Sequence, residues 1–385
     1  MGLPLDHITV FEMAGLAPAP FAGLIMADFG ANVIRIDRSQ GFNADVLTRN
    51  KRSIALDLKN PVAIKTLLEL FKTADVLLDP FRPGVMEKLG LGPDVLLKQN
   101  PRLIYARLSG FGQHGPNAQT AGHDINYIAI AGALSMIGRQ GEKPFFPVNI
   151  LGKSCTDFAG GGLMCVMGIL MALMERSKSG KGQIIDANLT AGTSYLATFP
   201  YLMQKYGLVW EGERGSNMLD GGAHFYETYR TKDNRFMAVG AIEPQFYAVL
   251  LEKLNLDKED TLPDQLDKDA WPDMKNKFQS IFAAKTQQEW CSIFDGSDAC
   301  VTPVLSFQDP IPGTDRKAEA PSPAPQLSRT PAKKPAVSKD ESPPFLTVGE
   351  NSIDILKEFG IGSEQIKELL TSNALVDAAS GKSKL

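Results

Sequence analysis

Short apolar runs alternate with amphipathic stretches along the first 110 or so residues of this 385-residue chain. The apolar runs predict buried strands at residues 8–11, 32–37, 53–58, 75–78 and 103–108. Between them, residues 18–29 and 61–72 have the spacing of helices. Strands and helices that alternate in this way are typical of a parallel sheet with helices on both faces. The pattern therefore predicts an α/β fold.

The turn after the first predicted strand decides between two kinds of nucleotide site. It reads Glu12-Met13-Ala14-Gly15 and lacks the Gly-x-Gly-x-x-Gly fingerprint that holds a dinucleotide pyrophosphate. We therefore predict a Rossmann-like large domain that does not bind NAD.

The pattern changes beyond about residue 190. Residues 226–231 and 236–240 read as antiparallel strands joined by a polar turn, and residues 243–294 have helical spacing. The predicted parts are a large domain at residues 1–200 completed by 345–380, a small α+β domain at 220–308, a linker at 309–345 rich in Pro, Ala and Ser, and a mobile tail at 376–385.

The most apolar run of the chain covers residues 158–174. It is shorter than the roughly 20 residues that span a bilayer, and it contains several glycines near its start. We therefore predict a buried core helix from 158 to about 175 and no membrane span.

Charge and cysteine usage exclude some classes of partner. The formal net charge is −4, whereas a surface that binds nucleic acid needs an excess of basic residues. The four cysteines have neither a CxxC spacing nor a dense framework, which indicates reduced intracellular thiols.

The two termini carry different information about location. The N-terminus lacks the basic and apolar regions of a secretory signal. The last three residues, Ser383-Lys384-Leu385, form the tripeptide that the peroxisomal import receptor binds. We expect a peroxisomal protein, with the mitochondrion left open as a second location.

One histidine and one aspartate are the strongest candidates for chemistry. Among the four histidines, His123 is flanked by a glycine and by the polar side chains of Asp124, Asn126 and Tyr127. Asp157 begins the segment Asp-Phe-Ala-Gly-Gly-Gly, and taken alone it is an ordinary helix N-cap. Together, an imidazole and a carboxylate can remove a proton from one face of a carbon and return one to the other.

A set of short motifs extends from residue 6 to about residue 308 and resumes weakly at 321–331. The motifs are Gly15-Leu16-Ala17-Pro18, Ala27-Asp28-Phe29-Gly30-Ala31, Arg35-Ile36-Asp37-Arg38, Lys51-Arg52-Ser53, Phe81-Arg82-Pro83-Gly84-Val85, Arg107-Leu108-Ser109-Gly110-Phe111-Gly112, Gly122-His123-Asp124-Ile125-Asn126-Tyr127, Asp157-Phe158-Ala159-Gly160-Gly161-Gly162 and Gly240-Ala241-Ile242-Glu243-Pro244-Gln245-Phe246. Together they resemble the α-methylacyl-CoA racemases, whose larger family also holds the type III CoA-transferases.

The resemblance implies roles for individual residues. His123 and Asp157 would be the acid–base pair, supported by Glu243. The residues implied to bind CoA or the rest of the substrate are Arg38, Leu56, Asp57, Leu58, Lys59, Arg82, Gly122, Asp124, Ile125, Asn126 and Tyr127. No metal and no cofactor is implied, because CoA is part of the substrate. The family fold is an interlocked homodimer whose active site lies between the large domain of one chain and the small domain of the other.

Three hypotheses of function follow. The first is a racemase of 2-methyl-branched fatty acyl-CoA that transfers protons through an enolate. The second is a type III CoA-transferase with Asp157 as its nucleophile, which the imidazole at 123 and the Gly240-Ala241-Ile242-Glu243 segment disfavour. The third is an inactive CoA-binding scaffold. The methionines of the 158–174 helix are expected to fill the core, with an adaptable surface for the acyl chain as the alternative.

The chain departs from the family pattern just before Asp157. Lys153-Ser154-Cys155-Thr156 are about four residues more than the pattern has between its Asn-Leu-Leu segment and the aspartate. We expect a surface bulge that leaves Asp157 at the start of its helix. If the carboxylate moved instead, a shift of about 1 Å would cost about a hundredfold in rate.

Overall fold

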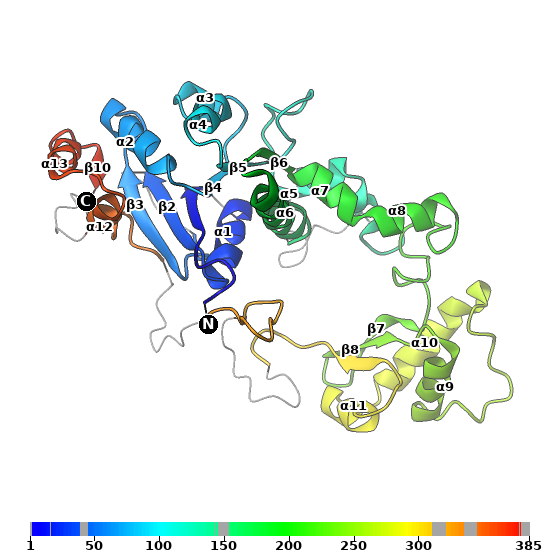
Figure 1. The fold of residues 1–385 in the computed structure, drawn as a ribbon. Coiled ribbons are helices and arrows are strands. Elements are labelled where there is room, and N and C mark those ends of the chain that lie inside the picture. Colours follow the sequence, from blue (N-terminus) through cyan, green and yellow to red (C-terminus); the bar gives the residue numbers. More distant parts are fainter. Residues whose placement is uncertain are drawn as a thin grey trace. The chain divides into compact units, whose positions relative to one another are not determined.

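The structure is a computed structural model that describes residues 2–15, 17–38, 45–141, 143–144, 154–309, 321–334, 345–376 and 378 (Figure 1). The chain divides into two compact units. The first unit contains Met1–Ala131, Pro147–Leu196 and Ala320–Leu385, and the second contains Gly132–Phe146 and Ala197–Glu319. The boundaries drawn from the sequence do not anticipate that residues 132–146 belong to the second unit.

The first unit is built around a seven-stranded sheet with the order β10-β3-β2-β1-β4-β5-β6. Its strands are β1 (Thr9–Met13), β2 (Asn32–Arg38), β3 (Lys51–Leu56), β4 (Val76–Asp79), β5 (Ile104–Ser109), β6 (Ile184–Asn188) and β10 (Leu375–Val376). All neighbours are parallel except β10, which runs antiparallel to β3. The predicted α/β fold is therefore confirmed. The order reverses beside β1, and folds of this kind bind ligands where the strand order reverses, at the carboxyl ends of the strands.

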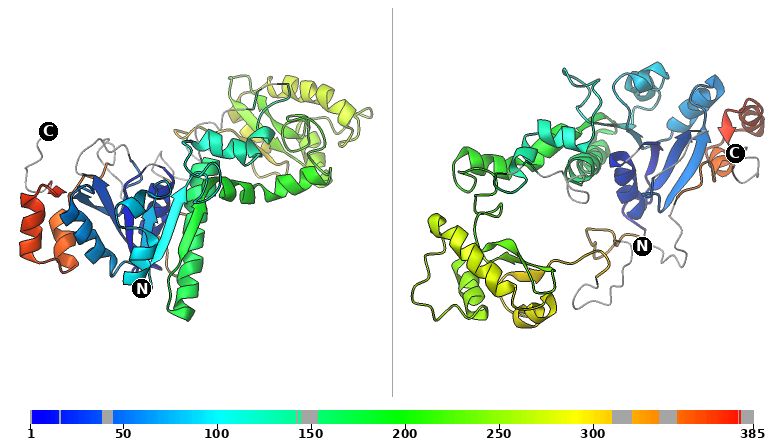
Figure 2. Two further views of the ribbon diagram at one scale, coloured as in Figure 1. Left: turned by 90° about the horizontal axis from the view of Figure 1, so that it is seen from above. Right: turned by 180° about the vertical axis from the view of Figure 1, so that it is seen from behind.

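Helices cover both faces of this sheet (Figure 1). One face packs against α1 (Pro18–Asp28) and α6 (Met164–Ser179). The other packs against α2 (Pro61–Phe71), α3 (Val85–Lys88), α4 (Pro93–Gln99), α12 (Ser352–Glu358) and α13 (Ser363–Thr371). The pair α12 and α13 comes from the far end of the chain, and α12 lies beside β3 (Figure 2). Residues 352–371 thus complete the first unit.

The small residues of α1 bring this helix close to the sheet over a buried ion pair. Lys51 Nζ lies 2.8 Å from Glu12 Oε2 and donates to the Pro20 carbonyl of α1 at 2.8 Å. A Cβ atom at Gly23 would lie 1.9 Å from Glu12 Oε2, so this position requires glycine. Burial raises the pKa of Glu12, while Lys51 lowers it.

The predicted core helix at 158–175 is longer than expected and changes form along its length. It begins as a π-helix, η2 (Ser154–Leu163), and continues as α6. The stretch Thr156–Ser179 has 24 residues and contains an 18-residue window with a mean hydropathy of 1.8, so by length and composition alone it is able to cross a membrane. The helix is thus longer than the apolar run at 158–174, but a core helix packed on a sheet passes the same test, and this single helix does not contradict the prediction of a core helix without a membrane span.

Only one side of α6 is buried. Cys165, Ile169 and other residues of one face pack on the sheet, where Cys165 and Ile169 have no exposed surface. Met171 and Met174, on the opposite face, are 58% and 68% exposed. The prediction that the methionines of this helix fill the core is wrong for these two residues.

The second unit contains a three-stranded antiparallel sheet, β7 (Tyr226–Arg230), β8 (Phe236–Gly240) and β9 (Val301–Pro303). This confirms the predicted antiparallel pair. The helices α9 (Pro244–Lys253), α10 (Trp271–Phe282) and α11 (Gln287–Phe294) contribute most of the other core residues, and the 3-10 turn η3 (Lys268–Ala270) precedes α10 without a buried residue. Stacked rings such as Tyr229 on Phe282, 5.1 Å apart, fill the space between sheet and helices. The unit also includes α8 (Thr198–Lys205) and the 3-10 turn η1 (Ala133–Met136).

Candidate active site

A cavity of about 780 Å³ opens at the carboxyl edge of the first unit's sheet. Its lining comes from the ends of β2, β3 and β4, on the edge where the fold predicts a ligand. The lining residues are Arg38, Leu56, Asp57, Leu58, Lys59, Pro80, Phe81, Arg82, Val85 and Leu89. The structure therefore brings together six of the residues that the resemblance implied for CoA or the rest of the substrate: Arg38, Leu56, Asp57, Leu58, Lys59 and Arg82.

Positive charge dominates the polar lining of this cavity. Arg38, Lys59 and Arg82 are exposed cations, and Asp57 is the one acid among the lining residues. The Asp57 carboxylate accepts a hydrogen bond from the backbone N–H of Lys59 at 3.0 Å, which holds the turn after β3. An excess of cations in a cavity of this size suits a ligand that carries several phosphate charges.

A buried carboxylate supports the loop that carries Arg82. Asp79 ends β4, is fully buried, and accepts a hydrogen bond from the backbone N–H of Phe81 at 2.9 Å. Burial raises the pKa of Asp79 to about 6, against the lowering effects of the Phe81 N–H and of Arg107. Sequence analysis did not identify this residue, because nothing in the order of the residues shows that Asp79 is buried beside Arg107.

His123 stands at the N-cap of α5 (Asp124–Ile130) with its side chain exposed. The Asn126 side chain accepts a hydrogen bond from the His123 N–H at 3.0 Å. The His123 carbonyl in turn accepts from the N–H groups of Asn126 and Tyr127 at 2.8 and 3.2 Å. The backbone of His123 is therefore fixed while its imidazole remains in contact with solvent.

The ring of Tyr127 explains why glycines stand at positions 110 and 122. A Cβ atom at Gly110 would lie 2.2 Å from Tyr127 Cε1, and one at Gly122 would lie 2.7 Å from the same atom. The Phe111 ring meets Tyr127 edge-on at 4.9 Å, and the Tyr127 hydroxyl donates to the Gly122 carbonyl. The segments 110–112 and 122–127 are thus parts of one packing unit.

The Tyr127 hydroxyl lies within the field of three charged residues. Burial raises its pKa, and the carboxylates of Asp157 and Asp124 raise it further, while Arg82 lowers it. The Tyr127 hydroxyl is therefore close enough to Arg82 of the cavity lining and to Asp157 for both charges to affect it.

The glycines after Asp157 allow η2 to pack closely against two helices. A Cβ atom at Gly162 would lie 2.8 Å from the Pro18 carbonyl oxygen of α1, and one at Gly161 would lie 3.0 Å from Leu189 Cγ of α7 (Leu189–Leu196). On the facing side, a Cβ at Gly192 of α7 would lie 1.9 Å from the Gly160 carbonyl oxygen. The Asp-Phe-Ala-Gly-Gly-Gly segment that carries Asp157 is therefore tightly packed against α1 and α7.

Asp157 is not the N-cap that its sequence context suggested. It lies within η2, which begins three residues earlier, and its side chain is half-buried. Its backbone N–H donates to Asp124 Oδ1 at 3.0 Å, so an aspartate from α5 caps this turn instead. The N-cap prediction failed because the helix begins three residues before Asp157, and the Asp124 carboxylate, 33 positions away, accepts from the Asp157 N–H.

The residues that the chain has in excess of the family pattern begin this helix. Ser154 is the first residue of η2, and Thr156 is fully buried. Lys153 lies outside the described residues. The expected surface bulge is therefore wrong for residues 154–156, which extend the helix at its N-terminal end.

Glu243 belongs to the second unit, where it is the exposed N-cap of α9. Desolvation raises the pKa of the nearby Cys300 thiol, and the carboxylates of Glu243 and Asp298 raise it further. Cys300 lines a cavity of about 640 Å³ that sequence analysis did not identify.

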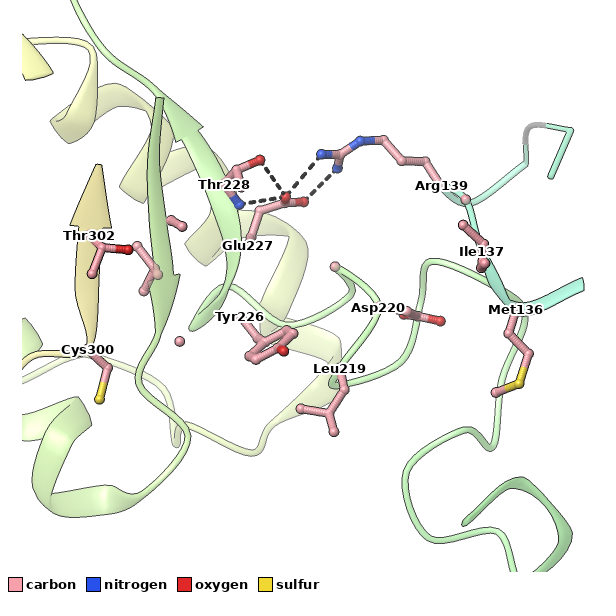
Figure 3. Close-up of a pocket in the computed structure, with 15 residues that line it drawn as sticks. Met136, Ile137, Arg139, Leu219, Asp220, Tyr226, Glu227, Thr228, Cys300 and Thr302 are labelled. Atoms are coloured by element: carbon pink, nitrogen blue, oxygen red, sulfur yellow. Dashed lines mark hydrogen bonds and ion pairs between the residues drawn. The ribbon is translucent and has the colours of Figure 1, made fainter. Parts of the chain in front are cut away.

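That second cavity contains an ion pair between distant parts of the sequence (Figure 3). Arg139 donates to both carboxylate oxygens of Glu227, at 2.7 and 3.0 Å, and Lys275 lies 3.4 Å from the same group. Burial opposes ionisation of Glu227, but the Arg139 guanidinium and the Thr228 N–H hold its pKa below the usual value. Residues 139 and 227 share no motif, so the sequence alone has no signal for the pair.

Comparison with known proteins assigns the fold and these motifs to a family. The model of CoA-transferase family III matches residues 5–320, and the chain belongs to this family. It is 52% identical to the human protein named alpha-methylacyl-CoA racemase over 395 residues, which cover 100% of both chains. The mouse protein of the same name is 51% identical over 99% of this chain and 100% of its own.

A solved structure of a CAIB/BAIF family protein from Brucella suis has a TM-score of 0.73 to this chain. It is 20% identical and covers 93% of this chain and 100% of its own, so this likeness concerns the fold alone.

Proposed function

We propose that this protein is a cofactor-independent racemase that interconverts the (2R) and (2S) forms of 2-methyl-branched fatty acyl-CoA thioesters. The observation that supports this most strongly is 52% identity, over the whole length of both chains, to a protein named alpha-methylacyl-CoA racemase. The packing of His123 and Asp157 on neighbouring elements of one unit agrees with the proposal.

The proposed chemistry uses two groups on opposite faces of the α-carbon. A thioester acidifies its α-hydrogen because the enolate places negative charge on the carbonyl oxygen. His123 removes the proton from one enantiomer and Asp157 returns a proton to the other face; for the opposite enantiomer the roles exchange. Imidazole suits this work because its charge changes near neutral pH, so both of its forms are available.

The enolate oxygen needs hydrogen-bond donors in the same site. We propose backbone N–H groups near Asp124 and in the Gly160–Gly162 segment for this role, because fixed donors stabilise charge that develops in the transition state. Gly122, Ile125 and Asn126 would shape the same part of the site. Glu243 would support the acid–base pair from the small domain of a partner chain.

We propose that the 780 Å³ cavity binds the nucleotide part of CoA. The lining residues include three exposed cations and one acid. Each hydrogen bond between a charged group and a phosphate contributes about 1.5–3 kcal/mol. Changing Arg82 to Ala is expected to raise the Kd for CoA by about tenfold, with a weaker dependence on salt. Lys98→Ala, an exposed lysine of α4, is the matched control; equal effects of the two changes would exclude the cavity as the nucleotide site.

We propose that the chain works as a homodimer. The outer face of α6 exposes Met167, Met171 and Met174, and the described structure leaves no residue of α8 buried. Exposed apolar side chains in such number on one helix are typical of an interface. Light scattering after size-exclusion chromatography should give twice the chain mass, and Met171→Glu should shift it toward the monomer. A monomeric wild-type protein would overturn this part of the proposal.

We propose a peroxisomal location through the import receptor. The tripeptide Ser383-Lys384-Leu385 lies outside the described residues, so its support is the sequence alone. Removing these three residues should redistribute a fluorescent fusion from peroxisomes to the cytosol. Unchanged peroxisomal import would show that another segment carries the address, and a mitochondrial signal would reveal the second location.

Solvent deuterium exchange separates the proposed activity from its alternatives. In D₂O, the racemase should convert one enantiomer of a 2-methylacyl-CoA to the other and incorporate deuterium at the α-carbon. Transfer of CoA to a free acid without such exchange would instead identify a CoA-transferase with Asp157 as nucleophile. If the protein catalyses neither reaction, the result would identify it as a CoA-binding scaffold.

A further inference from the structure

The Asp124 carboxylate forms a direct link between the two elements that carry the proposed bases. Asp124 is the first residue of α5, directly after His123, and it is 2% exposed. Its Oδ1 atom accepts the hydrogen bond from the Asp157 backbone N–H at 3.0 Å. The side chain therefore points into the protein, toward the second base.

The Asp157 N–H needs such a partner because of its place in the helix. In a π-helix each N–H bonds to the carbonyl five residues earlier, so the first N–H groups have no partner within the helix. Asp157 is the fourth residue of η2 and therefore depends on a partner from outside it. A buried N–H without an acceptor costs about 1–3 kcal/mol.

The covalent chain between the two residues does not fix their separation. It leaves the first unit after Ala131 and re-enters it at Pro147, and residues 132–146 belong to the second unit. The separation of α5 from η2 is instead set by contacts within the first unit, where α5, α7 and η2 pack together. The Asp124 hydrogen bond reaches the backbone of Asp157 itself.

We propose that Asp124 is a positioning residue that holds Asp157 at a fixed distance from His123 through this hydrogen bond. One peptide unit joins His123 to Asp124, and one hydrogen bond joins Asp124 to Asp157, so the two bases are connected by a short and stiff path. This inference rests on the proposed racemase function. It gives the Asp124 side chain a structural role, which is separate from any contact that the Asp124 backbone makes with the substrate.

Two substitutions at 124 separate the hydrogen bond from the negative charge. Asp124→Asn keeps an oxygen that can accept from the Asp157 N–H, whereas Asp124→Ala removes the acceptor. We expect Asp124→Ala to lower the rate of inversion by about a hundredfold, the cost of misplacing a reacting group by about 1 Å. Asp124→Asn should retain inversion within a few-fold of wild type.

The partition between exchange and inversion distinguishes positioning from general damage. Proton removal and return by His123 alone gives deuterium exchange with retention, and this step does not use Asp157. In Asp124→Ala the ratio of exchange with retention to inversion should therefore rise at least about tenfold. Equal losses of exchange and inversion, or no loss of either, would overturn the proposal, as would an Asp124→Asn enzyme as impaired as Asp124→Ala.

A double-mutant cycle tests whether Asp124 acts through Asp157. In an Asp157→Asn background, adding Asp124→Ala should cause almost no further loss of inversion, because the group that it positions is already disabled. Additive losses would mean that Asp124 acts by another route.

A third measurement does not depend on activity, so it stands even if the wild-type protein racemises nothing. Backbone hydrogen exchange of a peptide covering residues 154–163, followed by mass spectrometry, should be faster in Asp124→Ala than in wild type and unchanged in Asp124→Asn. Unchanged exchange in Asp124→Ala would exclude the hydrogen bond as a constraint on η2. A wild-type protein without racemase activity but with this exchange pattern would refute the proposed function and keep the link.

Discussion

The two proposed bases are held in opposite ways. His123 stands at the end of a short helix with an exposed imidazole, and only its backbone is fixed by hydrogen bonds. Asp157 is half-buried in a helix whose glycines leave no room for a single added carbon. The imidazole can exchange protons with solvent, whereas the carboxylate depends on the packing of α1, α5 and α7 around η2.

This difference teaches how the sequence constrains each side of the site. An exposed side chain tolerates changes in its surroundings. In a tightly packed segment, by contrast, every added atom displaces its neighbours. Substitution of the exposed His123 side chain itself should therefore act on chemistry alone. Substitutions near Asp157 should act on stability and chemistry together.

The largest expected effect comes from Asp157→Asn. The amide has nearly the same shape but cannot donate or accept the transferred proton, so inversion should fall by about a thousandfold. Exchange with retention on the His123 face should survive, and the melting temperature should change little. Chiral analysis of the product with mass spectrometry measures both rates, using Asp94→Asn at an exposed site of α4 as the control. A variant that inverts at the wild-type rate would remove Asp157 from the mechanism.

His123→Gln should lower the rate of inversion by a similar factor, between about 10² and 10⁴, without lowering stability. The side chain is exposed, so its loss leaves no cavity and no unpaired buried group. His114→Gln, another exposed histidine, should leave the rate unchanged. A substantial drop in melting temperature for His123→Gln would contradict the proposed contrast between an exposed and a close-packed base.

Gly162→Ala directly tests the tight packing of the segment that carries Asp157. The new Cβ would lie 2.8 Å from the Pro18 carbonyl oxygen and 2.9 Å from Phe21 Cδ1, so the helices must shift. We expect a loss of about 1–3 kcal/mol in the free energy of unfolding and a slower inversion. Gly362→Ala, where nothing lies within 4 Å of the added atom, is the control for urea unfolding. Equal stability of the two variants would mean that η2 is not tightly packed.

The second unit contains a histidine whose imidazole is buried, in contrast to the exposed imidazole of His123. His224 is 1% exposed among the rings of Phe225, Tyr247 and Phe278, and burial lowers its pKa from 6.5 to about 4. Between pH 4 and 6.5 the unfolded chain binds the proton that the folded chain excludes. Stability is therefore lost as the pH falls through this window.

At pH 5 this linkage amounts to about 2 kcal/mol relative to pH 7. Urea unfolding of the second unit at the two pH values should show the loss in wild type and a smaller loss in His224→Gln. His114→Gln should retain the wild-type dependence. A His224→Gln protein with the same pH dependence as wild type would show that this histidine does not titrate differently in the folded and unfolded chains.

The sequence predicted the parts of the molecule that depend on local order. The strands β1 to β5 and the helices α1 and α2 fall close to the predicted ranges, because each carries its own apolar period or capping residue. At the start of α2, for example, Asn60 accepts from the Val62 N–H at 2.9 Å directly before Pro61. The residues proposed to bind CoA were named from the family resemblance, and the parallel sheet gathers those that line the cavity at one edge because its strands end there.

The parts that sequence analysis missed depend on contacts between distant residues. The hydrogen bond from Asp157 to Asp124, the ion pair of Arg139 with Glu227, and the antiparallel β10 each join segments that no local pattern relates. The exposed methionines of α6 were assigned to the core because an apolar helix looks the same in sequence whether one face or all of it is covered.

The central claim is that His123 and Asp157 move protons on opposite faces of one carbon. The most direct measurement starts from a single enantiomer of a 2-methylacyl-CoA in D₂O and follows deuterium in both enantiomers during the first turnovers. The account predicts one deuterium at the α-carbon of each inverted molecule in wild type. It also predicts exchange without inversion in Asp157→Asn. Inversion without solvent deuterium, or inversion that persists in Asp157→Asn, would contradict it.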